Sequence, residues 1–132
     1  LISLGLLGAG VAWLALRSPS LSSPIVPEVT IQQAKALIEA GAMVLDVRAA
    51  KHYAARHLPS ALLFPLEVLE AGIPASLAAS MAKTIVVYCS DGVRVGPAAT
   101  QVLLNSGFAH AHNMTSGIEG WASSGMPVVT GA

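Results

Sequence analysis

The run Thr84–Tyr88 (TIVVY) restricts most strongly what this chain can fold into. It is rich in β-branched residues and continuously apolar, as a strand covered on both faces is. Cys89 follows the run directly, and a short glycine-containing loop then leads into a helical pattern that carries Val95 and Leu103. Strands buried on both faces occur in sheets whose parallel strands are joined by helices. The run therefore predicts an α/β domain.

The rest of the chain alternates between apolar runs and helical patterns. A capping box of Thr30 and Gln33 opens a helix that Gly41 ends, and Gly107 closes the helix that follows Cys89. The remaining patterns predict strands at 43–47 and 111–114, an apolar run at 61–64, and helices at 49–56, 66–72, 76–82 and 118–124. This alternation predicts a largely parallel sheet.

The first 27 residues differ in composition from the rest. The chain has 132 residues, enough for one compact domain and a terminal appendage. Residues 1–16 contain no charged side chain, so we interpret 1–17 as a signal or membrane-anchor segment, 18–27 as a Ser/Pro linker, and 28–132 as the domain. Sixteen helical residues span about 24 Å, a length that fits either a cleaved signal peptide or a retained membrane anchor. The alternative is that the segment is a buried helix of the domain. If the protein is bacterial, we expect it to be membrane-anchored or exported to the periplasm.

Composition excludes several classes of function. A single cysteine rules out a disulfide within the chain and any site built from several cysteines. Seven basic and seven acidic residues balance, so nucleic acid is not an expected partner. His110 and His112 could face one way on a strand, but no third ligand accompanies them, and we expect no metal and no cofactor.

The position of Cys89 indicates a reactive site. The carboxyl end of a parallel strand, next to the first turn of a helix, is where open α/β sheets build their sites. Backbone amides of a tight loop there form an anion cradle that stabilises a thiolate. Gly92 gives the loop its backbone freedom and Arg94 adds a cation. The alternative is that Cys89 is a small buried hydrophobic residue at a strand end.

From about Val29 to Val129, the chain resembles the rhodanese family. The resemblance rests on these segments in this order: Asp46–Arg48 (DVR), His57–Ala61 (HLPSA), Cys89–Arg94 (CSDGVR), Ser116–Trp121 (SGIEGW) and Gly125–Val128 (GMPV). It implies a rhodanese-like fold, with a mostly parallel five-stranded sheet flanked by helices on both faces. It also implies a cysteine persulfide intermediate in sulfur transfer.

The resemblance implies a role for each site residue. Cys89 would be the nucleophile and sulfur carrier, and Arg94 would orient the donor or brace the loop. The predicted substrate-binding residues are Ser90, Asp91, Gly92, Val93, Arg48 and His57. Asp46 and Arg48 are also expected to form a partly buried ion pair, and His57 to stabilise its turn. The partners would be a small sulfur donor, such as thiosulfate or a persulfide, and a thiol or cyanide acceptor.

The sequence departs from the family pattern at four positions. Ser60 and Ser116 replace glycines, so these turns are expected to be slightly reshaped, and Val95 replaces a serine. Asp91 places a carboxylate at the loop mouth, where it should repel small dianions such as thiosulfate.

Two other functions stay open at this point. One is phosphatase or arsenate reductase chemistry, because related scaffolds carry a similar loop with five residues between cysteine and arginine, whereas four intervene here. The other is a non-catalytic rhodanese-like binding or regulatory module, although inactive members often lack the cysteine. The sequence leaves the oligomeric state undetermined.

Overall fold

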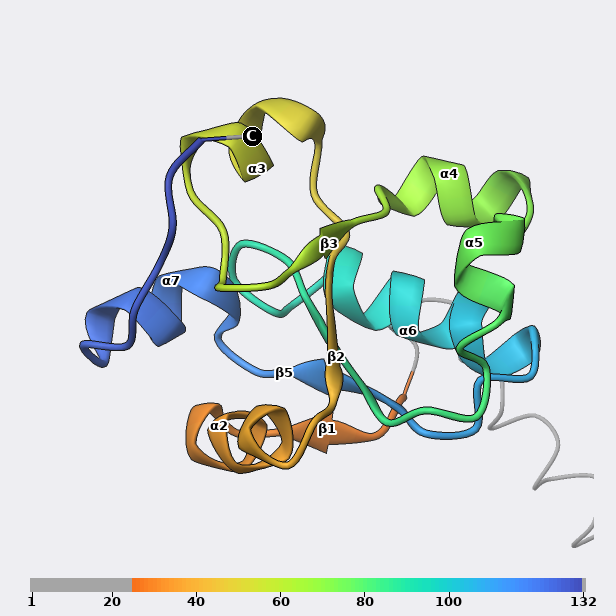
Figure 1. The fold of residues 1–132 in the computed structure, drawn as a ribbon, viewed down its shortest axis with the longest axis horizontal. Helices are drawn as coiled ribbons and strands as arrows, with labels where there is room; N and C mark the ends of the chain where they lie inside the picture. Colours follow the sequence, from red (N-terminus) through yellow and green to blue (C-terminus); the bar gives the residue numbers. More distant parts are fainter. Residues whose placement is uncertain (1–24, 132) are drawn as a thin grey trace, which may run out of the picture.

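The computed structural model describes residues 25–131, which form one parallel sheet between two groups of helices (Figure 1). The predicted segment 1–17 and most of the 18–27 linker lie outside the described residues. The strands are β1 (Glu28–Val29), β2 (Met43–Asp46), β3 (Leu62–Leu63), β4 (Ile85–Tyr88) and β5 (Ala111–Met114). Their order across the sheet is β1-β5-β4-β2-β3, and every pair is parallel. The predicted α/β class is confirmed, and β4 is the central strand.

The helices lie close to their predicted positions. They are α2 (Ile31–Glu39), α3 (Ala50–Ala55), α4 (Leu66–Ala71), α5 (Ala75–Ala78), α6 (Val95–Asn105) and α7 (Gly117–Ser123). The predicted helix 76–82 is wrong at its carboxyl end, because the chain after Ala78 continues in tight turns such as Ser80 N–H to Leu77 O. Among residues 25–131, no helix has both the length and the apolar character that a membrane span needs.

Side chains of α2 form its predicted capping box. The Thr30 hydroxyl accepts a hydrogen bond from the Gln33 amide at 3.1 Å, and the Gln33 side chain accepts one from the Thr30 amide at 2.9 Å. Gly41 follows the helix end with φ of 103°, a conformation that glycine adopts without strain. The helix therefore begins and ends where the sequence predicts.

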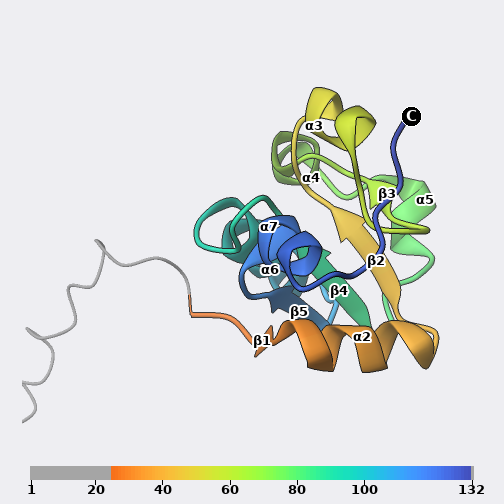
Figure 2. The same ribbon diagram turned by 90° about the vertical axis from the view of Figure 1, so that its left-hand side faces the viewer.

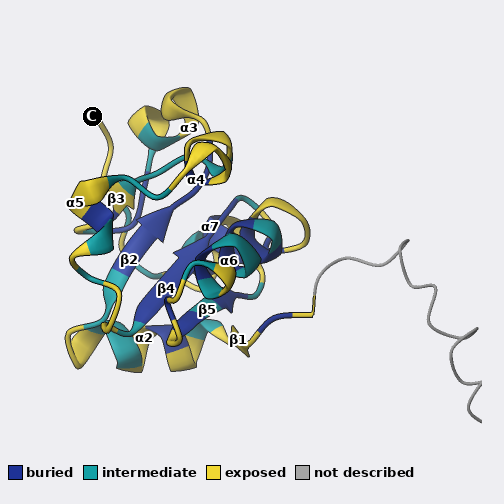
Figure 3. Cartoon of the chain, turned by 90° about the vertical axis from the view of Figure 1, so that its right-hand side faces the viewer, coloured by how far each residue is buried: buried dark blue, intermediate teal, exposed yellow. Residues whose placement is uncertain are grey.

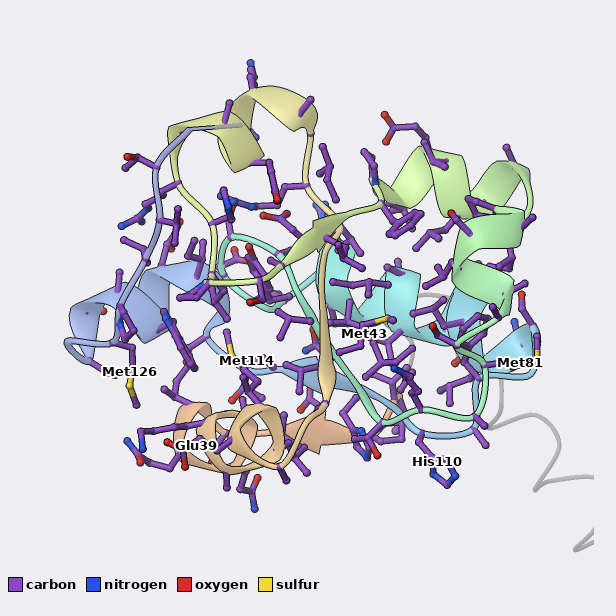
Figure 4. The ribbon with its side chains drawn as sticks, in the orientation of Figure 1. Glu39, Met43, Met81, His110, Met114 and Met126 are labelled. Carbon is purple, nitrogen blue, oxygen red and sulfur yellow. The ribbon has the colours of Figure 1, made fainter. Side chains whose placement is uncertain are left out.

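Side chains of β4 alternate between the two faces of the sheet. Ile85, Val87 and Cys89 join the core beneath α4, α5 and α6, while Val86 and Tyr88 join the core beneath α2 and α7. Figures 2 and 3 show the helix layers on the two sides, and in Figure 3 β4 is buried along its length. In Figure 4, two methionines from the two cores, Met43 and Met114, lie on opposite sides of β2. The alternation places the side chain of Cys89 on the α6 face, at the carboxyl end of the central strand.

Two turns that carry serine in place of a family glycine take a left-handed backbone. Ser60 has φ of 64° and Ser116 has φ of 68°. L-residues other than glycine pay a conformational cost there, on the order of 1 kcal/mol. The serines therefore occupy a backbone conformation that suits glycine better.

Candidate active site

An open cavity of about 490 Å³ lies where β2 and β4 end. Four segments line it: the residues after β2, the start of α4, the loop after β4 and the start of α6. The lining residues are Arg48, Ala49, His52, Leu66, Glu67, Cys89, Ser90, Asp91, Arg94 and Val95. The carboxyl edge of a parallel sheet is where such folds bind ligands, and this cavity holds the chain's single cysteine.

Cys89 forms part of the cavity wall with little of its surface exposed. Its relative exposure is 3%, and the amide of Gly92 donates a hydrogen bond to its Sγ atom at 3.2 Å. The carboxylate of Asp91 lies on the same side of the loop, with Oδ1 4.0 Å from Sγ. An amide aimed at sulfur stabilises negative charge there. One contact of the cradle predicted from the sequence is therefore present.

The amino end of α7 holds the Cys89 loop from behind. The amides of Ile118 and Glu119 donate to the carbonyls of Cys89 and Ser90, both at 3.0 Å. A Cβ on Gly117 would stand 2.4 Å from each of these two carbonyl oxygens, and φ at Gly117 is 54°. Only a glycine lets α7 approach the loop this closely. This contact fixes the backbone directly after the Cys89 side chain.

Asn113, from β5, holds the loop from inside the sheet. It is fully buried, and its Nδ2 donates to the carbonyl of Gly92 at 3.1 Å and to Glu28 Oε2 at 3.2 Å. Its Oδ1 faces Gly96, where an added Cβ would lie 2.2 Å from Oδ1 and 3.1 Å from the sulfur of Cys89. The first turn of α6 therefore packs on Asn113 and Cys89 together because Gly96 has no side chain.

Asp46 and Arg48 form a buried ion pair at the end of β2, as predicted. Arg48 Nη2 lies 2.6 Å from Asp46 Oδ2, and the Tyr88 hydroxyl donates to the same oxygen at 2.6 Å. Burial and then the hydrogen bond to Asp46 raise the pKa of Tyr88 well above its ordinary value. Burial alone would lower the pKa of Arg48, but its hydrogen bonds and attraction to Asp46 raise it. The phenol thus stays protonated and the guanidinium stays charged.

The cavity gathers three of the six residues that the sequence predicts for substrate binding, together with both predicted catalytic residues. Arg48, Ser90, Asp91 and Arg94 line it together with Cys89. Gly92 contributes its amide instead, and the Val93 side chain is 62% exposed outside the lining.

His57 is not among the residues that line this cavity. It is 7% exposed, its Nδ1 lies 2.9 Å from the carbonyl of Tyr53, and its ring stacks on the Tyr53 ring at 3.8 Å. Its backbone also exchanges two 2.8 Å hydrogen bonds with Val129. These contacts agree with the expected turn-stabilising role, and they give no support to substrate binding by His57.

Sequence reasoning missed the side of the cavity that faces the cysteine loop. His52 of α3, together with Leu66 and Glu67 of α4, completes the lining. These residues match no motif, and Leu66 and Glu67 reach the cavity because α4 packs against α6. Among residues 25–131, no group of three or more His, Cys, Asp or Glu side chains is placed to hold a metal ion.

Comparison with known proteins agrees with the fold. The human single domain sulfurtransferase TSTD1 is 27% identical to this chain, with a TM-score of 0.65 over 75% of this chain and 97% of that one. The Alr3790 protein from Anabaena sp. is also 27% identical, with a TM-score of 0.68 over 77% of this chain and 80% of that one. A thiosulfate sulfurtransferase from Pseudomonas aeruginosa shares the fold at 24% identity and a TM-score of 0.66, over 81% of this chain and 21% of that one.

A family model covers most of the described structure. The model of the rhodanese-like domain matches residues 30–124, from the cap of α2 to the end of α7. The match includes the sheet from β2 to β5, the Cys89 loop and every residue that lines the cavity. The chain belongs to the rhodanese-like domain family.

Proposed function

We propose that this chain is a sulfurtransferase in which Cys89 carries the transferred sulfur as a persulfide. The proposal rests on the position of Cys89, which lines an open cavity. Its Sγ atom accepts a hydrogen bond from the Gly92 amide at 3.2 Å. A purely structural cysteine would need neither the cavity nor the amide. Solved relatives that are named as sulfurtransferases support the same activity.

The proposed reaction has two displacement steps. In the first, the Cys89 thiolate attacks the outer sulfur of a sulfane donor, a bond forms between Sγ and that sulfur, and the donor's S–S bond breaks. The electron pair of the broken bond leaves with the remainder of the donor, which is sulfite when thiosulfate reacts. In the second, an acceptor such as cyanide attacks the outer sulfur and leaves as thiocyanate, which restores the thiolate. Covalent catalysis of this kind divides one transfer into two easier steps.

The loop around Cys89 suits a sulfur better than a phosphoryl group. Four residues lie between Cys89 and Arg94, one fewer than in the related phosphatase loops. Phosphoryl transfer requires donors aimed at three equatorial oxygens. Within the described part of the chain, the one amide recorded at the Cys89 sulfur is that of Gly92. A single amide on Sγ stabilises a thiolate but does not surround a tetrahedral oxyanion.

The proposal predicts the outcome of a paired assay. Purified protein should form thiocyanate from cyanide and a sulfane donor, thiosulfate or an organic persulfide, and should not hydrolyse an aryl phosphate above background. The thiocyanate is measured as its coloured iron complex against a protein-free control. Cysteine-dependent phosphate hydrolysis without thiocyanate formation would refute the proposal and favour the phosphatase alternative.

A further inference from the structure

The charged side chains that line the cavity leave an excess of negative charge. Arg48, Glu67, Asp91 and Arg94 are the arginine and carboxylate side chains in the lining. Arg48 is already neutralised, because its guanidinium lies 2.6 Å from Asp46 in a pair that is almost fully buried. The charged side chains that remain in the lining are one arginine, Arg94, and two carboxylates, Glu67 and Asp91, and a Cys89 thiolate adds a further negative charge. A donor thus approaches a site with an excess of negative charge.

The Asp91 carboxylate is held beside the sulfur. The amide of Val93 donates to Asp91 Oδ1 at 3.0 Å, and the same oxygen is 4.0 Å from Sγ of Cys89. A carboxylate fixed at this distance acts on any group that approaches the sulfur, because Coulomb energy falls only as the inverse of distance. Glu67, exposed in the first turn of α4, is the second carboxylate of the lining.

The cavity also offers more than an inorganic donor needs. Ala49, Leu66 and Val95 give its wall an apolar part, from three different segments. A volume of about 490 Å³ lies in the range of pockets that bind small organic molecules. A donor with a carbon substituent can bury apolar surface here, whereas thiosulfate has none to bury.

From the charge and the shape of the cavity, we infer that the preferred sulfur donor is an organic persulfide with an uncharged or cationic substituent, and that thiosulfate is a poor donor. This inference rests on the proposed sulfur transfer. The Cys89 thiolate attacks the outer sulfur of the persulfide R–S–S⁻, the Sγ–S bond forms, and R–S⁻ leaves with the electron pair of the broken S–S bond. The outer sulfur atom moves from the donor thiol to Cys89, and no external oxidant or reductant takes part.

The inference is tested with donors that differ in charge but little in size. The probes are persulfides of 2-aminoethanethiol, 2-hydroxyethanethiol and mercaptoacetate, whose substituents are cationic, neutral and anionic, and thiosulfate, a dianion without a carbon substituent. The rate of Cys89 persulfide formation is measured by quenching and intact mass at low and high salt. We expect the rate to fall in that order at low salt. Added salt should raise the thiosulfate rate and lower the aminoethyl rate relative to the hydroxyethyl donor, because screening weakens both repulsion and attraction.

Two variants should change the relative rates of persulfide formation with these donors, and a third variant should not. Asp91→Asn and Glu67→Gln each remove one carboxylate, and each should raise the thiosulfate rate by about 3- to 10-fold at low salt while lowering the aminoethyl rate. The matched control is Glu70→Gln, an exposed carboxylate on α4 outside the cavity lining. Its rates with all four donors should stay within about twofold of those of the unchanged protein.

The outcomes separate this inference from the proposed function. If Cys89 gains sulfur from every donor at rates independent of charge and salt, or if thiosulfate is the fastest donor, the inference is wrong and sulfur transfer stands. If Glu70→Gln changes the rates as much as Asp91→Asn does, the effect belongs to the overall charge and the cavity argument is wrong. If no donor places sulfur on Cys89, the proposed function fails, and this inference fails with it.

Discussion

Replacing Cys89 by serine is expected to reduce thiocyanate formation to background, a loss of at least about 10³-fold. A serine hydroxyl stays protonated near neutral pH and cannot carry sulfane sulfur. The side chain is 3% exposed within the core beneath α6, so the added polarity should cost only about 1–2 kcal/mol in the free energy of unfolding. The assay is thiocyanate formation, and circular dichroism reports the fold.

A second variant tests whether the activity is lost through misfolding rather than through the loss of the sulfur. Cys89→Ala removes the sulfur without a new polar group, and it should be equally inactive and fully folded. The matched control is Ser76→Ala, an exposed serine on α5 outside the cavity lining, which should retain full activity. Sulfur transfer by folded Cys89→Ala at a substantial fraction of the original rate would show that another group carries the sulfur.

Replacing Asp46 by alanine is expected to lower the free energy of unfolding by about 3–5 kcal/mol, a large part of the stability of a small domain. Asp46 is fully buried and accepts hydrogen bonds from the Arg48 amide at 2.9 Å, from the Arg48 side chain and from the Tyr88 hydroxyl. The variant leaves a guanidinium at 8% exposure without its counterion. Denaturant unfolding measures the difference.

Two further variants show whether the loss of stability comes from breaking the buried ion pair or from removing any carboxylate. Asp91→Ala removes the same residue type from an exposed loop position, and it should cost about 1 kcal/mol or less. The double variant Asp46→Ala/Arg48→Met should recover part of the loss, because no buried charge then lacks its partner. Equal destabilisation by Asp46→Ala and Asp91→Ala would contradict the role assigned to the pair.

Local patterns predicted the elements on which the site is built. Thr84–Tyr88 was predicted as a strand and forms β4 at Ile85–Tyr88, and the predicted strand 111–114 coincides with β5. The Thr84–Tyr88 run succeeds because its apolar character is continuous and both faces of the sheet are covered there. β1 was not predicted, because Glu28–Val29 is only two residues long and forms through pairing with β5, a contact distant in sequence.

The groups that support the site were harder to predict because their roles depend on tertiary packing. Tyr88 was interpreted only as an apolar strand residue, although its hydroxyl donates to Asp46 and accepts from the Leu58 amide. Asn113 lies in no segment that the sequence marks for the site, and yet it holds the Gly92 carbonyl from within the sheet. No local pattern indicates which loop a side chain will meet when the strands assemble.

The central claim is that Cys89 carries the transferred sulfur, and the mass of the intact protein tests it most directly. After incubation with an organic persulfide and removal of excess donor, the protein should gain the mass of one sulfur atom, and cyanide should remove that mass as thiocyanate forms. Cys89→Ala should gain nothing under the same conditions. An unchanged mass with every sulfane donor, or the same gain in Cys89→Ala, would contradict the account.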